Sequence, residues 1–171
     1  MTELKRLFDC IEYNLEKKPL EDMLAGKEAG QWRKYSTAEC KTIIDNLSAG
    51  LLSLGIGCGD MTAEGRDKVA ILCKNRPEWV MLDMAVQQIG AILVPVYPTI
   101  NVNELAFVLS DAQVKMAFVN DEDLFLKVVS LKDKVPSLKD IFTFEHVQNA
   151  RHWKEVTALT SAEGIAEAKK I

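Results

Sequence analysis

Four short apolar runs recur at a nearly constant interval along this chain, and that interval constrains the fold more than any other feature. The runs begin near residues 69, 91, 116 and 141. Steps of about 25 residues match one strand followed by one crossover helix. Runs that are apolar throughout are typical of strands buried on both faces. The spacing therefore predicts an α/β fold with a mostly parallel sheet and crossover helices.

Capping signals place helices between and before these strands. Ser36 and Glu39 form the S-x-x-E pattern of a capping box, which predicts a helix to about residue 54. Pro77 suits the first turn of a helix after the first strand. Asn101 or Asn103 can cap a helix that runs to about residue 110. Further helices are expected over residues 4–15 and 121–131 and from residue 161, and a short strand over residues 32–35.

The expected helix over residues 4–15 has an apolar stripe. Its members are Leu4, Leu7, Phe8, Ile11 and Leu15, which follow helical spacing. The stripe is predicted to pack on the core. Contact with a membrane surface is the alternative, but the other face lacks the strongly basic character that such contact favours.

A glycine-rich segment, residues 55–59, resembles a phosphate-binding loop in composition only. Such loops follow a strand and open a helix, so that backbone N–H groups meet the anion. This segment instead follows a predicted helix. Gly55 is therefore interpreted as a left-handed C-cap, and no nucleotide is expected to bind here.

Charge balance and cysteine usage exclude several classes of protein. With 21 basic and 25 acidic residues, the net charge is −4, which gives no general reason to bind nucleic acid. The four cysteines form no C-x-x-C pair and lie far in sequence from the two histidines, His146 and His152. No metal site is predicted, and both histidines are expected at the surface. Unpaired cysteines suit reducing conditions, so a cytoplasmic location is expected.

Ligands of parallel sheets gather at the carboxyl ends of the strands, which here are residues 73–75, 96–99 and 120–121. No G-x-x-x-x-G-K-[ST] or G-x-S-x-G motif is present. The motifs alone support an α/β domain without a named reaction.

Residues 67–121 closely resemble the amino-terminal region of AMP-forming acyl-CoA synthetases, which belong to the adenylate-forming superfamily. The strings that carry the resemblance are D-K-V-A-I-L from Asp67, N-R-P-E-W from Asn75 and G-A-I-L-V-P-V-Y-P-T from Gly90. N-R-P-E-W with V-Y-P-T about twenty residues later is most similar to the long-chain fatty acid–CoA ligase branch. The resemblance extends over about residues 4–145.

The resemblance implies a reaction in two steps. A fatty acid and ATP, with Mg²⁺, give an acyl-adenylate and pyrophosphate, and the thiol of coenzyme A then displaces AMP. It also implies that residues 1–171 are a partial N-terminal domain, with the phosphate loop and C-terminal domain beyond Ile171. This chain alone is therefore expected to bind no cofactor, to have no catalytic residue and to be inactive, with the remainder of its own chain as a partner.

The resemblance places Tyr97, Pro98 and Thr99 beside the path of the acyl and pantetheine groups, as substrate-binding candidates. The competing interpretation is a turn in which two prolines end the strand and Tyr97 packs. Arg76 is interpreted as part of a helix start, with a phosphate contact as the alternative.

Two other functions stay open at this stage. One is an adenylate-forming enzyme for another carboxylic acid, such as an aryl acid or an amino acid. The other is a free-standing α/β module that binds a partner without catalysis. Peripheral contact of the complete enzyme with the inner face of a membrane also stays open, because its substrate would dissolve in lipid.

Overall fold

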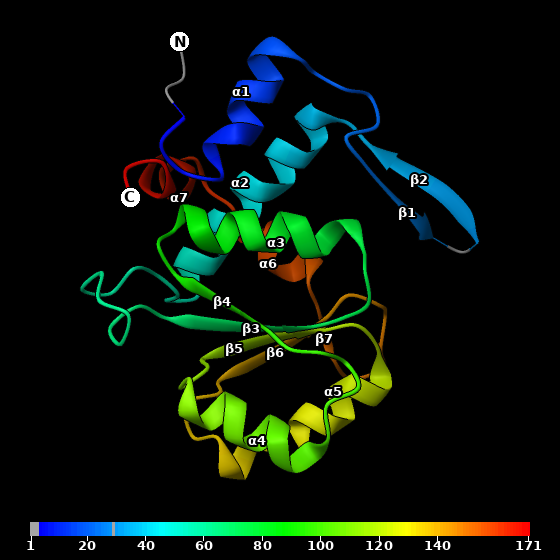
Figure 1. Ribbon diagram of the computed structural model, residues 1–171, viewed down its shortest axis with the longest axis vertical. Helices are drawn as coiled ribbons and strands as arrows, with labels where there is room; N and C mark the ends of the chain where they lie inside the picture. Colours follow the sequence, from blue (N-terminus) through cyan, green and yellow to red (C-terminus); the bar gives the residue numbers. More distant parts are fainter. Residues whose placement is uncertain (1–3, 29) are drawn as a thin grey trace.

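The computed structural model describes residues 4–28 and 30–171 (Figure 1). Its helices are α1 (Asp9–Lys17), α2 (Thr37–Ser53), α3 (Pro77–Gln88), α4 (Val102–Asp111), α5 (Glu122–Val129), α6 (Lys154–Ala158) and α7 (Ala162–Ala168), with a 3₁₀ turn η1 (Lys132–Lys134). Its strands are β1 (Leu24–Glu28), β2 (Gln31–Tyr35), β3 (Lys68–Leu72), β4 (Ile92–Pro95), β5 (Met116–Val119), β6 (Asp140–Thr143) and β7 (Arg151–His152). None of the described helices is long and apolar enough to cross a bilayer.

A five-stranded sheet with the order β4-β3-β5-β6-β7 forms the centre of the molecule, and every neighbouring pair is parallel. In its register Val69 lies between Leu93 of β4 and Met116 of β5. The predicted parallel α/β fold is confirmed, and the four predicted strands lie where the apolar runs begin. The two-residue strand β7 was not predicted.

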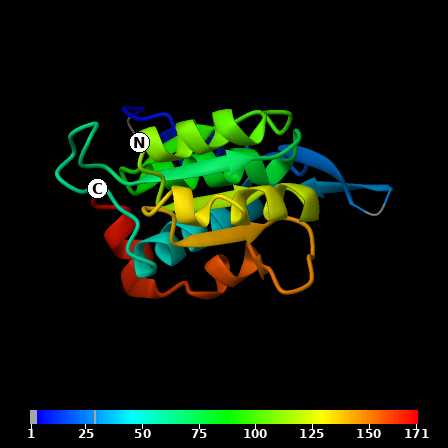
Figure 2. The same cartoon turned by 90° about the horizontal axis from the view of Figure 1, so that it is seen from below.

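Alternate residues of each strand enter two separate cores, as the period of two along a strand requires. Val69 and Ile71 of β3 belong to the first core, which α2, α3, α6 and α7 cover. Ala70 and Leu72 belong to the second core, which α4 and α5 cover. Figures 1 and 2 show these helix layers on opposite faces of the sheet. Phe118 lies at the centre of the first core, with its ring 5.3 Å from that of Phe142.

The predicted caps begin α2, α3 and α4. The hydroxyl of Ser36 accepts a hydrogen bond from the N–H of Glu39 at 3.1 Å. The Glu39 carboxylate pairs with Arg33 of β2, so it joins the helix to the hairpin. Pro77 is the first residue of α3. Asn101, the first of the two asparagine candidates, caps α4.

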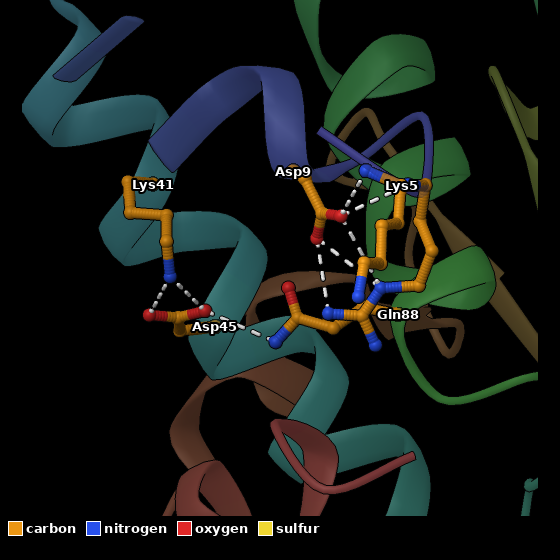
Figure 3. A network of polar contacts seen from close by, with 6 residues as sticks. Lys5, Asp9, Lys41, Asp45 and Gln88 are labelled. Atoms are coloured by element: carbon orange, nitrogen blue, oxygen red, sulfur yellow. Dashed lines mark hydrogen bonds and ion pairs between the residues drawn. The ribbon is translucent and has the colours of Figure 1, made fainter. Parts of the chain in front are cut away.

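The prediction for the amino-terminal helix is wrong in its first turns. Helix α1 begins at Asp9 rather than near residue 4, and Leu4 and Leu7 are 51% and 58% exposed. The Asp9 carboxylate accepts hydrogen bonds from the backbone N–H groups of Lys5 and Arg6 at 3.1 and 2.9 Å. These bonds hold the preceding residues in a turn. The apolar stripe therefore reaches the core only from Ile11 onward, and Figure 3 shows the turn around Asp9.

A second part of the network in Figure 3 joins α2 to α3. Asp45 accepts hydrogen bonds from the ammonium group of Lys41 at 2.6 Å and from the side-chain amide of Gln88 at 3.1 Å. Nearby, the Ser48 hydroxyl donates to the carbonyl of Ala85 at 3.3 Å. These bonds fix the position of α3, whose first residues border the site described below.

The antiparallel hairpin β1–β2 projects from one end of the molecule (Figure 1). The strand over residues 32–35 was predicted, but its partner β1 was not. The base of the hairpin packs against α3, because a Cβ atom added at Gly26 would lie 2.7 Å from Cδ of Pro77. Trp32, farther along the hairpin, is 67% exposed.

Candidate active-site edge

The carboxyl ends of β3, β5 and β6 meet at one edge of the sheet. Helix α3, which follows β3, packs on the first core, while α5, which follows β5, packs on the second core. Adjacent parallel strands whose helices leave to opposite faces form a switch point, where ligands of α/β proteins commonly bind. A cavity of about 580 Å³ lies at this point, within the range of roughly 300–1,000 Å³ typical of small-molecule sites.

The cavity has walls from five parts of the chain. Lining residues come from the hairpin (Gly26, Lys27, Glu28, Arg33, Tyr35), from α2 (Ile43), from the segment after β3 (Lys74, Asn75, Arg76, Pro77, Glu78), from the end of β5 (Asn120) and from the segments around β7 (Phe144, Glu145, His146, His152, Trp153, Lys154). Two of the three strand ends predicted to carry ligand contacts, residues 73–75 and 120–121, therefore contribute to the cavity.

Arg76 and Glu78 form a buried ion pair on the cavity wall. Nε and Nη2 of Arg76 donate to the two oxygens of Glu78 at 2.9 and 3.1 Å. The guanidinium also lies over the ring of Phe144, with 4.8 Å between Cζ and the ring centroid. Burial by itself raises the pKa of Glu78, but the hydrogen bonds and charge of Arg76 outweigh it and hold that pKa below its ordinary value. Arg76 is thus part of the helix start, as interpreted. Nε and Nη2 of its guanidinium are already bonded to Glu78.

Asn120 connects the three strand ends. Its Oδ1 accepts from Nη1 of Arg76 at 3.3 Å, and its Nδ2 donates to Glu145 at 2.9 Å and to Asp121 at 3.1 Å. Asp121 also caps α5, because its Oδ1 accepts from the N–H of Leu124. One buried amide therefore couples the loops after β3, β5 and β6.

The two histidines stack on each other beside these loops. The ring centroids of His146 and His152 are 4.1 Å apart, and Nε2 of His152 lies 3.0 Å from the carbonyl of Phe144. Burial lowers the pKa of His152, with a smaller contribution from His146. His146 is exposed, as predicted, whereas His152 is half-buried.

The sequence-predicted substrate residues lie elsewhere. Tyr97, Pro98 and Thr99 follow β4 at the edge of the sheet and do not line the cavity. The Tyr97 side chain is 85% exposed, so it does not pack as the turn interpretation required. Lys127 of α5 supports this turn, with Nζ 3.5 Å from the carbonyl of Pro98 and 3.1 Å from that of Ile100. The substrate-binding role of the three residues stays a prediction.

The two histidines and Lys154 line the cavity and were not predicted from the sequence. The signal that could have found them was Glu145 and His146 directly after the fourth predicted strand, at a fourth carboxyl end. His152 and Lys154 could not be assigned, because β7 has only two residues and no periodicity.

The described residues contain no cluster of metal ligands, and the 55–59 segment does not form a phosphate-binding loop. Residues 4–28 and 30–171 contain no group of three or more His, Cys, Asp or Glu side chains able to hold a metal ion. The 55–59 segment follows α2, and Gly55 has φ of +77°, the left-handed C-cap that was predicted. A Cβ atom at Gly59 would lie 2.0 Å from the carbonyl oxygen of Gly65, so this loop is closed by its own backbone. The described residues therefore do not fit Mg²⁺.

All four cysteines are free thiols in the structure. Burial raises the pKa of Cys73, at the end of β3, to about 12, which leaves it protonated and unreactive near neutral pH.

The model of the AMP-binding enzyme family matches residues 11–168. The chain belongs to this family.

Among its curated relatives within the AMP-binding family are long-chain-fatty-acid–CoA ligases. FadD15 of Mycobacterium tuberculosis is 31% identical over 112 residues, which cover 66% of this chain and 18% of that protein. Long chain acyl-CoA synthetase 3 of Arabidopsis thaliana is 26% identical over 152 residues, covering 86% of this chain and 22% of the relative. The chain thus spans about a fifth of the length of the curated relatives it matches.

The fold of this AMP-binding family member also matches solved structures. One, from Rhodopseudomonas palustris and provisionally described as a long-chain-fatty-acid CoA ligase, has a TM-score of 0.72 and 25% identity, and the match covers 92% of this chain and 37% of that one. An anthranilate CoA ligase in complex with anthranoyl-AMP has a TM-score of 0.71 at 17% identity, which is a likeness of fold.

Proposed function

We propose that this chain forms the amino-terminal part of a long-chain fatty acid–CoA ligase. The observation that carries the proposal is the match of residues 11–168 to the AMP-binding family together with 31% identity to a mycobacterial long-chain ligase. In the proposed reaction, the fatty carboxylate attacks the α-phosphate of ATP with Mg²⁺ as the counter-ion. Acyl-adenylate and pyrophosphate form, and the coenzyme A thiol then displaces AMP to give acyl-CoA.

Within that reaction, this chain supplies structure rather than reacting groups. The absence of a metal-binding cluster in the described residues and the closed 55–59 loop support this view. The residues that contact ATP and Mg²⁺ would come from the part of the family's length that this chain does not span. We therefore expect the isolated chain to be inactive.

The exposed turn at Tyr97, Pro98 and Thr99 is the segment that we propose to face substrate in the complete enzyme. The 85% exposure of Tyr97 leaves a large aromatic side chain without a covering element among the described residues. The support from Lys127 holds the turn in one conformation. The four free cysteines are in keeping with a cytoplasmic location, which is part of the proposal.

A chimera tests the proposal. Residues 11–168 of this chain replace the matching segment of the Mycobacterium tuberculosis ligase, and acyl-CoA formation is measured with fatty acids of graded chain length and with aryl acids. We expect activity with long-chain fatty acids, while the isolated chain gives no ATP–pyrophosphate exchange.

Two outcomes would contradict the proposal. One is a folded chimera that prefers aryl acids, which would support the other adenylate-forming function. The other is robust exchange by the isolated chain, which would contradict its structural role.

Replacing Tyr97 by Ala in the chimera should raise KM for fatty acid or coenzyme A more than it lowers kcat, and an unchanged KM would remove the substrate role of Tyr97.

A further inference from the structure

The cavity at the carboxyl ends of β3 and β5 has a charge distribution that neither the fold nor the proposed ligase reaction explains. Its lining contains five lysine or arginine side chains and three glutamates. Each glutamate already accepts a hydrogen bond from a neighbouring side chain; the pairs are Glu28 with Tyr35, Glu78 with Arg76, and Glu145 with Asn120. Each carboxylate thus has a protein partner, and the basic side chains of the lining outnumber the acidic ones.

The lining also contains three lysines, none of which has an ion pair in the part of the chain that the structure describes; Lys27 lies over the ring of Trp32, with 5.5 Å between Nζ and the ring centroid. Within residues 4–28 and 30–171, the ammonium groups of Lys74 and Lys154 make no hydrogen bond or ion pair with a protein acceptor. Lys74 lies just after β3, and Lys154 is the first residue of α6. Two positive charges thus line the cavity without a hydrogen-bonded or ion-paired partner among the described residues, although the charge of Lys154 helps to lower the pKa of Glu78.

The arginines of the cavity cannot supply the planar fork that favours a carboxylate. Arg76 uses its fork on Glu78, and Arg33 uses its guanidinium on Glu39. The groups that remain are compact ammonium ions, which bind phosphate oxygens as point charges.

Part of the cavity wall is held in place by contacts within the protein. Asn120 forms hydrogen bonds with both Arg76 and Glu145, and the guanidinium of Arg76 stacks on the ring of Phe144. A site whose shape is set in advance loses less conformational freedom when a ligand binds.

We propose that this cavity binds a small phosphate-bearing anion between the ammonium groups of Lys74 and Lys154. The anion carries at least two negative charges, which match the two lysines. The proposal is independent of the ligase function, because it needs only residues that this chain contains.

Calorimetric titration of the 171-residue chain with inorganic pyrophosphate, without divalent ions and at constant ionic strength, tests the proposal. We expect saturable binding at one site. The double variant Lys74→Gln/Lys154→Gln should bind at least roughly tenfold more weakly, because two charge-assisted contacts are lost. The matched control Lys132→Gln, an exposed lysine of η1 outside the cavity, should bind like the unchanged chain.

Three results would overturn the site or its ligand class. Absence of saturable binding to the unchanged chain would remove the site. Equal affinities of the double variant and Lys132→Gln would show that the two lysines do not form it. Tighter binding of succinate, a dicarboxylate, than of pyrophosphate would overturn the phosphate class.

All three lysines are exposed, so the variants should fold normally, and matching circular dichroism spectra and melting temperatures check this. Because no catalysis is measured, failure here leaves the ligase proposal standing.

Discussion

At the scale of single residues, Arg76 and Glu78 concentrate opposite charges where α3 begins. Their side chains are only 19% and 6% exposed. Removal of one member of such a pair leaves the other charge buried without a partner, which costs more than the pair contributes. The geometry of the cavity wall therefore depends on both residues.

We expect Glu78→Gln to lower the free energy of unfolding by roughly 3 kcal/mol, because the guanidinium of Arg76 loses its buried counter-charge. The pKa of Glu78 is lowered, so its stabilising effect is complete above the ordinary glutamate value of about 4.3 and is lost as pH falls through the lowered value. Urea titration between neutral and acid pH measures both effects. The exposed control Glu122→Gln should change stability by less than about 0.5 kcal/mol, and an equal loss in both variants would contradict the role of the pair.

His152 should give the protein a second pH dependence. Burial lowers its pKa, so the unfolded chain binds the proton more readily, and stability should fall as pH drops below the ordinary histidine value of about 6.5. His152→Gln should flatten the unfolding midpoint across this range. The control His146→Asn should keep most of the dependence, because burial is the larger cause of the lowered pKa. Loss of the dependence in the control alone would identify the charge of His146 as the cause instead.

At the scale of the elements, close approach of backbones decides the packing of α2. A Cβ atom at Gly50 would lie 1.9 Å from the carbonyl oxygen of Val156 in α6. Gly50→Ala should therefore lower the free energy of unfolding by about 1–3 kcal/mol, as overpacked sites do. Gly57→Ala is the matched control, since its Cβ would lie 3.8 Å from Leu52. Thermal denaturation that finds both variants alike would contradict the close contact.

Strong local patterns made most of the elements predictable. The apolar run at residues 69–73 and the cap at Ser36 were sufficient to predict β3 and α2. Strand β1 has the sequence L-A-G-K-E, which lacks alternation, and its pairing with β2 is visible only in three dimensions. The start of α1 was missed because Asp9 acts on residues before it rather than after it. For the cavity, two strand ends were predicted, whereas the walls from the hairpin and from β7 depend on tertiary contacts.

At the scale of the whole molecule, one sheet is shared by two cores. Trp79 and Trp153 report only on the first core, and Leu105 of α4 is fully buried in the second. If the sheet couples both cores into one cooperative unit, Leu105→Ala should lower stability by roughly 2–5 kcal/mol and shift the fluorescence and circular dichroism transitions equally. A fluorescence midpoint that stays unchanged while the dichroism transition moves would show that the two faces unfold separately.

The two edge strands of the sheet, β4 and β7, limit how copies of the chain can pair with each other. At one border β4 ends on Pro95, which offers no N–H group, and at the other β7 extends for only two residues. A long, regular border is a template on which another chain can add a strand and start a fibril. Here β7 is too short to serve as such a template, and Pro95 interrupts hydrogen bonding along β4. Growth by strand addition is therefore hindered at both edges.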